Sequence, residues 1–166
     1  MRGEEYVVVL RDGPDKLIGS ILILCTQNSV RSPMLEGLCR RAFGQTLYVR
    51  SAGVEAAEIN PFAIEVMAEI GLDIANINPA AFYDLPDDSY DLIITLSRES
   101  YDLARKIAEE QAVDIEYWSV ADPPAFGEGN REQTLESLRR IRDDLMRHLE
   151  NRFDLVFNME DDTKDA

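Results

Sequence analysis

Strand-like and helix-like stretches alternate along the chain. Runs rich in apolar residues, typical of short buried strands, cover residues 19–24, 47–51, 90–96 and 115–120. Apolar residues then recur at helical spacing over residues 32–43, 61–70, 98–111 and 131–152. This order predicts an α/β fold in which a four-stranded parallel sheet carries helices on both faces. Residues 6–10 could form an extra N-terminal edge strand, because Asp12-Gly13-Pro14 favours a turn that would reverse the chain after it.

Local signals place several helix ends. Asn60 is a favourable N-cap and Pro61 suits the first helical position, so a helix should begin there. Gly44 and Gly71 follow the last apolar positions of two predicted helices and are expected to end them. Binding sites in such folds lie at the carboxyl ends of the strands, which directs attention to the segments that follow each strand.

The composition fits one globular domain. The chain has 166 residues, of which 45% are hydrophobic and 30% charged. We therefore expect a single domain over residues 1–166, with a core at about 18–152, an N-terminal extension at 1–17 and an acidic tail at 159–166. A net charge of −15 argues against binding to nucleic acid or to an anionic membrane, since both need a positive surface.

Cysteine usage and hydropathy bear on the cellular compartment and on the cofactors that the chain could bind. No apolar run approaches the roughly 20 residues of a membrane span, and the first residues do not form a secretory signal. Cys25 and Cys39 are the only cysteines, which gives no disulfide framework and favours the reducing cytoplasm. With His148 as the only histidine, no zinc site is expected, and no motif predicts an organic cofactor.

The segment between the first predicted strand and helix carries the chemistry. Cys25 ends the strand, a short loop follows, and Arg31 and Ser32 open the helix. Backbone N–H groups of such a loop and the helix N-terminus can bind an anion, and a guanidinium can hold two of its oxygens. The same positive surroundings, with a hydroxyl donor in Ser32, favour the Cys25 thiolate. Taken alone, Cys25 could equally be a small buried hydrophobe, but the strand–loop–helix context favours a nucleophile in an oxyanion site.

These motifs resemble those of the low-molecular-weight protein tyrosine phosphatase family, which also includes arsenate reductases of the same fold. The likeness rests on residues 21–44 with Cys25, Arg31 and Ser32, and on Asp122-Pro123 far downstream. Segments 51–53, 60–61 and 65–74 also resemble the family. The resemblance implies a flavodoxin-like three-layer sandwich and a phosphatase that hydrolyses phosphomonoesters, including phosphotyrosine, through a phosphocysteine intermediate.

The resemblance also implies a role for each matching residue. Cys25 would attack phosphorus, and Asp122 would protonate the leaving oxygen and then activate water. Asn28 would be held in a strained conformation by hydrogen bonds from Ser32 and Ser51, and Asn76 stands where many members carry a supporting histidine. The oxyanion would be held by a loop of seven residues: Thr26, Gln27, Asn28, Ser29, Val30, Arg31 and Ser32.

Some positions depart from the family pattern. Gln27 replaces the usual glycine, and Ala57 and Pro124-Ala125 stand where phosphotyrosine-specific members carry aromatic residues, with Phe126 nearby. Strict phosphotyrosine specificity is therefore not expected. The tyrosines of later segments are interpreted as packing residues; they are Tyr83, Tyr101 and Tyr117.

Two alternatives stay open beside the phosphatase. The first is an arsenate reductase that uses an external thiol, since Cys39 lies at a core-facing helical position and Ser97 stands roughly where some reductases carry a relay cysteine. The second is a non-catalytic module that binds an oxyanion or a phosphoprotein. The expected partner is thus a phosphorylated protein or a small phosphate or arsenate ion. The segment around the loop carries a net positive charge, whereas the rest of the chain is acidic. Its charged residues are Arg31, Arg40, Arg41 and Arg50 against Glu36.

Overall fold

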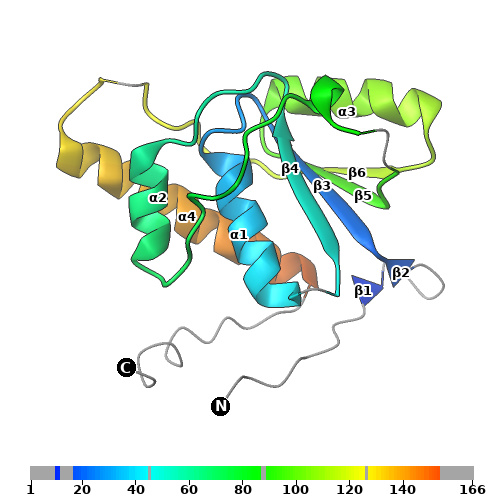
Figure 1. Cartoon of the computed structure of the whole chain (residues 1–166), viewed down its shortest axis with the longest axis horizontal. Coiled ribbons are helices and arrows are strands. Elements are labelled where there is room, and N and C mark those ends of the chain that lie inside the picture. Colours follow the sequence, from blue (N-terminus) through cyan, green and yellow to red (C-terminus); the bar gives the residue numbers. More distant parts are fainter. Residues whose placement is uncertain (1–9, 12–16, 45, 87–88, 126, 154–166) are drawn as a thin grey trace, which may run out of the picture.

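A four-stranded parallel sheet lies at the centre of the protein (Figure 1). The computed structural model describes residues 10–11, 17–44, 46–86, 89–125 and 127–153. The strands are ordered β4-β3-β5-β6. Cys25 pairs with Gly53, and Leu24 pairs with Thr95, so three strands end at nearly the same level. The strand bounds are β3 (Ser20–Cys25), β4 (Tyr48–Gly53), β5 (Leu92–Thr95) and β6 (Asp114–Tyr117).

Helices cover both faces of this sheet, as the pattern predicts. Figure 1 shows α1, α2 and α4 on one face and α3 on the other. Strand β3 alternates accordingly: Ile21 and Ile23 join the larger core with α1 and α4, while Leu22 and Leu24 join the smaller core with α3. The helices are α1 (Arg31–Phe43), α2 (Pro61–Ala68), α3 (Arg98–Glu110) and α4 (Arg131–Phe153), with a short 3₁₀ turn η1 (Phe82–Asp84).

The N-terminal strand differs from the prediction. Leu10–Arg11 (β1) and Leu17–Ile18 (β2) form a separate two-stranded antiparallel sheet, and within the described residues β1 does not join the four-stranded sheet. The rest of the predicted strand, residues 6–9, and the predicted acidic tail, 159–166, lie outside the described residues.

The predicted helix signals are confirmed at Asn60, Pro61 and Gly44, but not at Gly71. The Asn60 side chain accepts a hydrogen bond from the N–H of Phe62, with Pro61 at the first helical position. Gly44 is the C-cap of α1, with a positive φ of 59°. Gly71 also has a positive φ, 77°, but α2 ends earlier than predicted, at Ala68, and its C-cap is Glu69. None of the helices described here is both long enough and apolar enough to cross a membrane.

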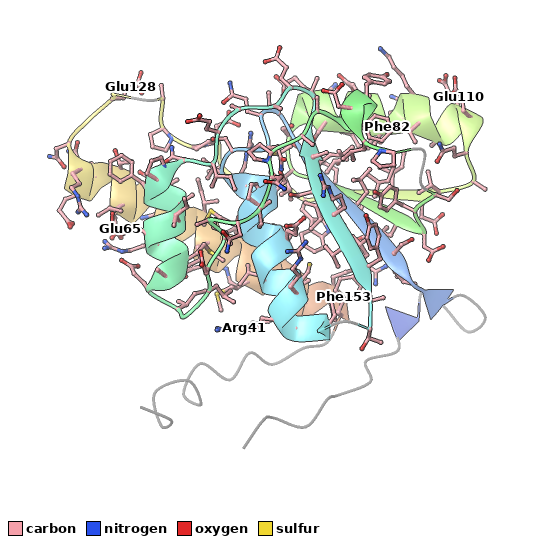
Figure 2. The ribbon with its side chains drawn as sticks, in the orientation of Figure 1. Arg41, Glu65, Phe82, Glu110, Glu128 and Phe153 are labelled. Atoms are coloured by element: carbon pink, nitrogen blue, oxygen red, sulfur yellow. The ribbon has the colours of Figure 1, made fainter. Side chains whose placement is uncertain are left out.

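Ion pairs tie α2 to α4 across the surface of the larger core. Glu69 accepts hydrogen bonds from Arg139 at 2.8 Å and from Arg142 at 2.9 Å. Glu65, labelled in Figure 2, pairs with Arg131 at the start of α4. The hydrogen bond from Arg139, followed by that from Arg142, lowers the pKa of Glu69. These contacts hold α4 and the segment before it against the body of the protein.

Candidate active site

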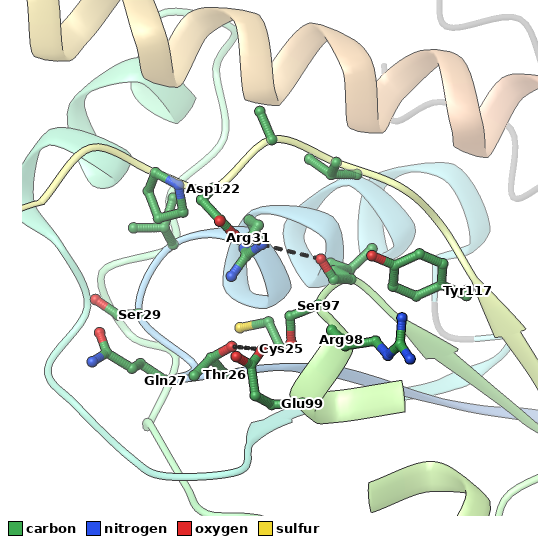
Figure 3. A pocket seen from close by; sticks show the side chains of 15 residues that line it. Cys25, Thr26, Gln27, Ser29, Arg31, Ser97, Arg98, Glu99, Tyr117 and Asp122 are labelled. Atoms are coloured by element: carbon green, nitrogen blue, oxygen red, sulfur yellow. Dashed lines mark hydrogen bonds and ion pairs between the residues drawn. The ribbon is translucent and has the colours of Figure 1, made fainter. Parts of the chain in front are cut away.

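A hollow opens at the carboxyl ends of the strands (Figure 3). It has a volume of about 540 Å³ and is lined by the loop after β3, by the start of α3 and by the segment after β6. The chain passes from β3 to β4 on one side and later to β5 on the other, so this point is where the strand order reverses. Ligand sites of open α/β sheets form at such points.

The loop from Cys25 to Arg31 wraps around the floor of this pocket. Its carbonyl groups bind outward: those of Cys25, Thr26 and Gln27 accept hydrogen bonds from the N–H groups of Val54, Glu55 and Ala57, at 2.9–3.0 Å. The Ser29 carbonyl likewise accepts from Asn60. A loop whose carbonyls are bound on the outside can turn its N–H groups inward, which is the arrangement of an anion-binding nest.

Gly53 allows β4 to approach this loop closely. A Cβ atom built on Gly53 would lie 2.0 Å from the Glu55 carbonyl oxygen and 2.8 Å from the Asn28 nitrogen. Any side chain at position 53 would therefore displace the loop backbone. The structure thus gives a physical reason for glycine at the end of the Ser51–Gly53 segment.

A buried polar network holds the loop in shape. Asn28 has a positive φ of 52°, a region that asparagine tolerates better than most residues, and its side chain is fully buried. Its amide Nδ2 donates to Ser32 Oγ at 2.8 Å and to Ser51 Oγ at 3.0 Å. The residues are those that the resemblance implies, but the direction is reversed, because Asn28 donates instead of accepting. Ser32 can then donate its own proton to Cys25 Sγ, which lies 2.9 Å away.

The supporting role expected for Asn76 is wrong for this structure. Asn76 is exposed. The Asn28 Oδ1 acceptor is instead occupied by the backbone N–H of Ala80, at 2.9 Å. A peptide N–H can replace a side-chain donor at this place because residues 80–81 run alongside the end of β4, where the Gly53 N–H donates to the Ala80 carbonyl.

Arg31 and Asp122 meet above Cys25, on the side of the pocket that faces α4 (Figure 3). Arg31 is 6% exposed, and its Nη1 donates to the Leu96 carbonyl at 3.1 Å and to Asp122 Oδ1 at 2.9 Å. The Asp122 side chain is 88% exposed. Beside the Cys25 thiol, the buried guanidinium of Arg31 can bind an oxyanion. The exposed carboxyl group of Asp122 can exchange protons with that oxyanion.

Further pocket residues were not anticipated from the sequence. Tyr117, interpreted as a packing residue, lines the pocket and is 47% exposed, while its ring packs against Tyr101 at 5.7 Å between centroids. Arg98 and Glu99 also line it, and Thr26 Oγ1 donates to Glu99 Oε2 at 3.3 Å. Tyr117 is the last residue of β6, and Arg98 and Glu99 begin α3 shortly after the end of β5. The rule that sites form at carboxyl ends of strands could have found them, had the end of the fourth strand been placed at Tyr117 instead of Val120.

The two remaining residues of interest, Ser97 and Cys39, have clear structural roles. Ser97 caps α3, with its side chain accepting from the Ser100 N–H, and it also lines the pocket. Cys39 is fully buried in α1, and burial, reinforced by the Glu36 carboxylate, raises the pKa of its thiol well above the usual range. Eight residues separate it from Arg31, or about 12 Å of helix. Cys39 is therefore a core residue, and it is not among the residues that line the pocket with Cys25.

Both the sequence and the fold of this chain are similar to those of known proteins. The family described as "Low molecular weight phosphotyrosine protein phosphatase" matches residues 20–155. An arsenate reductase of Bacillus subtilis (strain 168) is 34% identical over 125 residues, which are 75% of this chain and 88% of that protein. A glutaredoxin arsenate reductase of Synechocystis sp. is 28% identical over 79% of this chain and 93% of that protein. The solved tyrosine phosphatase amsI of Erwinia amylovora shares the fold, with a TM-score of 0.67 and 20% identity, over 87% of this chain and 98% of that one.

Proposed function

The chain belongs to the low molecular weight phosphotyrosine protein phosphatase family, and we propose that within this family it reduces arsenate, with Cys25 as nucleophile and an external thiol as reductant. Relatives above 30% identity that carry the name arsenate reductase support the choice of substrate. The observation that carries the choice of reductant is the isolation of Cys25, because the second cysteine of the chain is buried inside α1. This differs from the sequence interpretation, in which phosphomonoester hydrolysis came first.

In the first step, the Cys25 sulfur attacks arsenic of an arsenate ion held by the loop N–H groups and Arg31. An arsenic–sulfur bond forms, and an arsenic–oxygen bond breaks as that oxygen leaves as water. Asp122 supplies the proton that the departing oxygen needs, from its position beside Arg31 at 2.9 Å. Ser32 stabilises the attacking thiolate through its hydroxyl donor.

In the second step, an external thiolate attacks the Cys25 sulfur. The electron pair of the sulfur–arsenic bond passes to arsenic, which leaves as arsenite, and a mixed disulfide remains on Cys25. A second thiolate then attacks the mixed disulfide and releases the Cys25 thiolate. In total, arsenic gains two electrons and two thiols are oxidised to one disulfide. The reducing cytoplasm, where we place the protein, would supply such thiols.

Phosphomonoester hydrolysis is the second candidate, and two observations favour it. Asp122 stands at the pocket with the exposure needed to meet a leaving oxygen and then a water molecule. Tyr117 gives the wall an aromatic surface, which Pro124 and Ala125 do not provide. In this reaction Cys25 would form a phosphocysteine, and a phosphorylated protein would be the substrate.

A side-by-side assay tests the proposal. Purified protein is given arsenate with glutathione, with glutaredoxin or with thioredoxin as thiol source, and separately an aryl phosphate. We expect arsenite with the small thiol or glutaredoxin, unchanged activity in Cys39→Ala, and none in Cys25→Ser. Loss of arsenite formation in a folded Cys39→Ala variant would contradict the external-thiol route. Aryl phosphate turnover without arsenite would favour the phosphatase. Phosphate binding without either reaction would leave only a binding module.

A further inference from the structure

A second hollow adjoins the active-site pocket on the side of α4. It has a volume of about 380 Å³ and lies between the segment after β6 and the helix α4. Ala121 and Asp122 line both hollows, so the two meet along these residues. Figure 3 shows Asp122 between Cys25 and α4, drawn in pale orange. An elongated small molecule in the second hollow would therefore lie next to the pocket that holds Cys25.

The charges around this hollow suit a molecule that carries both carboxylate and ammonium groups. Asp122 is paired with Arg31, which leaves Arg140, Asp144 and Arg147 facing the hollow. Asp144 lies 3.2 Å from Arg147, and Arg140 lies 3.7 Å from Glu136 on the same helix. The two arginine side chains are 79% and 67% exposed. Ion pairs this exposed contribute little, so an incoming carboxylate can replace them.

The spacing of these residues sets the length of such a molecule. Arg140 and Arg147 are seven residues apart on α4, which places them on one face with about 10 Å of helix axis between them. Arg147 and Asp144 together offer a cation and an anion at one end, and Arg140 offers a cation at the other. A peptide thiol with an amino-acid group at one end and a carboxylate at the other matches this order.

We propose that this second hollow binds the carboxylate ends of a small peptide thiol, such as glutathione, and presents its sulfur to Cys25. The inference rests on the external-thiol reaction proposed above. It also answers a difficulty of that reaction: a protein with a net charge of −15 repels anionic thiols in general, so a local pair of arginines is needed to hold one. An uncharged thiol would gain nothing from this hollow.

Reaction of Cys25 with a disulfide measures binding at the second hollow without the use of arsenate. The Cys25 thiolate attacks one sulfur of oxidised glutathione, a sulfur–sulfur bond forms between them, and reduced glutathione leaves as a thiolate. Hydroxyethyl disulfide undergoes the same exchange without carrying charge. The ratio of the two rates therefore measures recognition of the charged ends, and mass spectrometry of the modified Cys25 measures each rate.

The test compares two double variants with equal loss of charge. Arg140→Gln with Arg147→Gln removes the proposed contacts, and Arg105→Gln with Lys106→Gln removes two exposed cations of α3. We expect the first to lower the rate with oxidised glutathione by about tenfold and to leave the rate with hydroxyethyl disulfide within about twofold. The second should change neither by more than about twofold. The high exposure of all four side chains makes folding defects small, which thermal melting checks.

Several results would overturn the inference: no loss in the first variant, an equal loss with both disulfides, or an equal loss in the control variant. The outcome is separate from that of the proposed function. Arsenite formation without any preference for oxidised glutathione would reject the second hollow and keep the reductase. A clear preference without arsenite formation would keep the thiol site and reject the reductase.

Discussion

A single guanidinium serves two acceptors in the active site. Arg31 Nη1 donates both to the Leu96 carbonyl and to Asp122, whereas an oxyanion in the loop would need the same group. Asp122 is thus an internal competitor for the substrate as well as the proposed proton donor. The two roles predict that removing its charge affects binding and turnover in opposite directions.

Replacing Asp122 with asparagine tests this conflict. We expect Asp122→Asn to bind phosphate or arsenate about two- to fivefold more tightly, because the Asp122 carboxylate no longer competes with the oxyanion for Arg31. Arsenite formation should fall by about 10²–10⁴, because proton donation to the departing arsenate oxygen is lost. Titration calorimetry and steady-state kinetics measure the two effects. Glu110→Gln, at the remote end of α3 in Figure 2, controls for net charge. Weaker oxyanion binding in Asp122→Asn would contradict the competition.

Gly53 gives a second prediction at the residue scale. Gly53→Ala places a methyl group against the loop backbone, so we expect destabilisation of about 1–3 kcal/mol and loss of oxyanion binding. Millimolar phosphate should then no longer raise the melting temperature, whereas we expect it to do so in the parent protein. Gly19→Ala is the matched control, since its added Cβ would meet only Asp91 Oδ2 at 3.4 Å. A normal phosphate shift in Gly53→Ala would show that the loop tolerates displacement.

The residues that the sequence could predict are those whose side chains carry the chemistry. Cys25, Arg31 and Ser32 follow from one loop motif, and the structure brings them together with Asp122. The role predicted for Asn76 is wrong because the N–H of Ala80 donates to Asn28 Oδ1 instead. A backbone donor leaves no signature in a sequence. The direction of the Asn28 hydrogen bonds was also out of reach, since an amide side chain can donate or accept.

At the scale of elements, a side chain of α1 accepts a hydrogen bond from one N–H group on the open edge of the sheet. Strand β4 is an edge strand, and the N–H of Ser51 donates to Glu36 Oε1 of α1 at 2.8 Å. Glu36 is 1% exposed, and its Oε2 lies 3.4 Å from Arg40. Burial raises the pKa of Glu36, with Arg40 opposing the shift. A charged carboxylate between α1 and β4 therefore costs stability.

The sign of this effect is testable by pH. The folded protein holds the Glu36 proton more tightly than the unfolded chain, so stability contributed by this group falls as pH rises from about 4.5, the ordinary value, through the raised pKa. We expect Glu36→Gln to remove that decline while keeping an acceptor for Ser51. Urea unfolding between pH 4 and pH 7 measures it. Identical pH dependence in the variant and the parent protein would contradict the assignment.

Glu69 should show the opposite sign. Its folded pKa is lowered, first by Arg139 and then by Arg142, so its contribution is present above the ordinary value of about 4.5 and is lost as pH falls through the lowered pKa. Glu69→Gln should therefore destabilise the α2–α4 contact at pH 7, by about 0.5–1 kcal/mol, and this loss should shrink as pH falls through the lowered pKa. The same unfolding experiment reports both residues. A larger loss at pH 3 than at pH 7 would contradict the prediction.

Element order could be predicted from periodicity, but element ends could not. The fourth strand was predicted over residues 115–120 and is found at Asp114–Tyr117. Trp118 and Val120 are both buried in the core although they lie beyond the strand. An apolar pattern indicates burial, whereas a strand is defined by its backbone hydrogen bonds to a neighbouring strand. Burial continues beyond the end of the strand where the chain leaves the sheet but still runs along the core. This separation also hid Tyr117 at the pocket.

At the scale of the whole molecule, the active site is a positive point in a negative field. The loop and Arg31 attract an anion over a few ångströms, while the net charge of −15 acts over the Debye length, about 30 Å in 10 mM salt and 8 Å in 150 mM salt. Salt therefore removes the long-range repulsion more completely than the short-range attraction. Anionic reagents should reach Cys25 faster as salt increases, and neutral ones should not.

Alkylation of Cys25 measures this balance without assuming a reaction. Iodoacetate and iodoacetamide attack the same thiolate, but only the first carries a negative charge. We expect the ratio of their rates to rise by about two- to fivefold between 10 mM and 300 mM sodium chloride, because the screened term is repulsive. Cys25→Ser should remove labelling by both, since burial and a raised pKa keep Cys39 unreactive. A ratio that falls with salt would mean that attraction at the loop extends beyond the pocket, and that the acidic surface does not limit access of anions to Cys25.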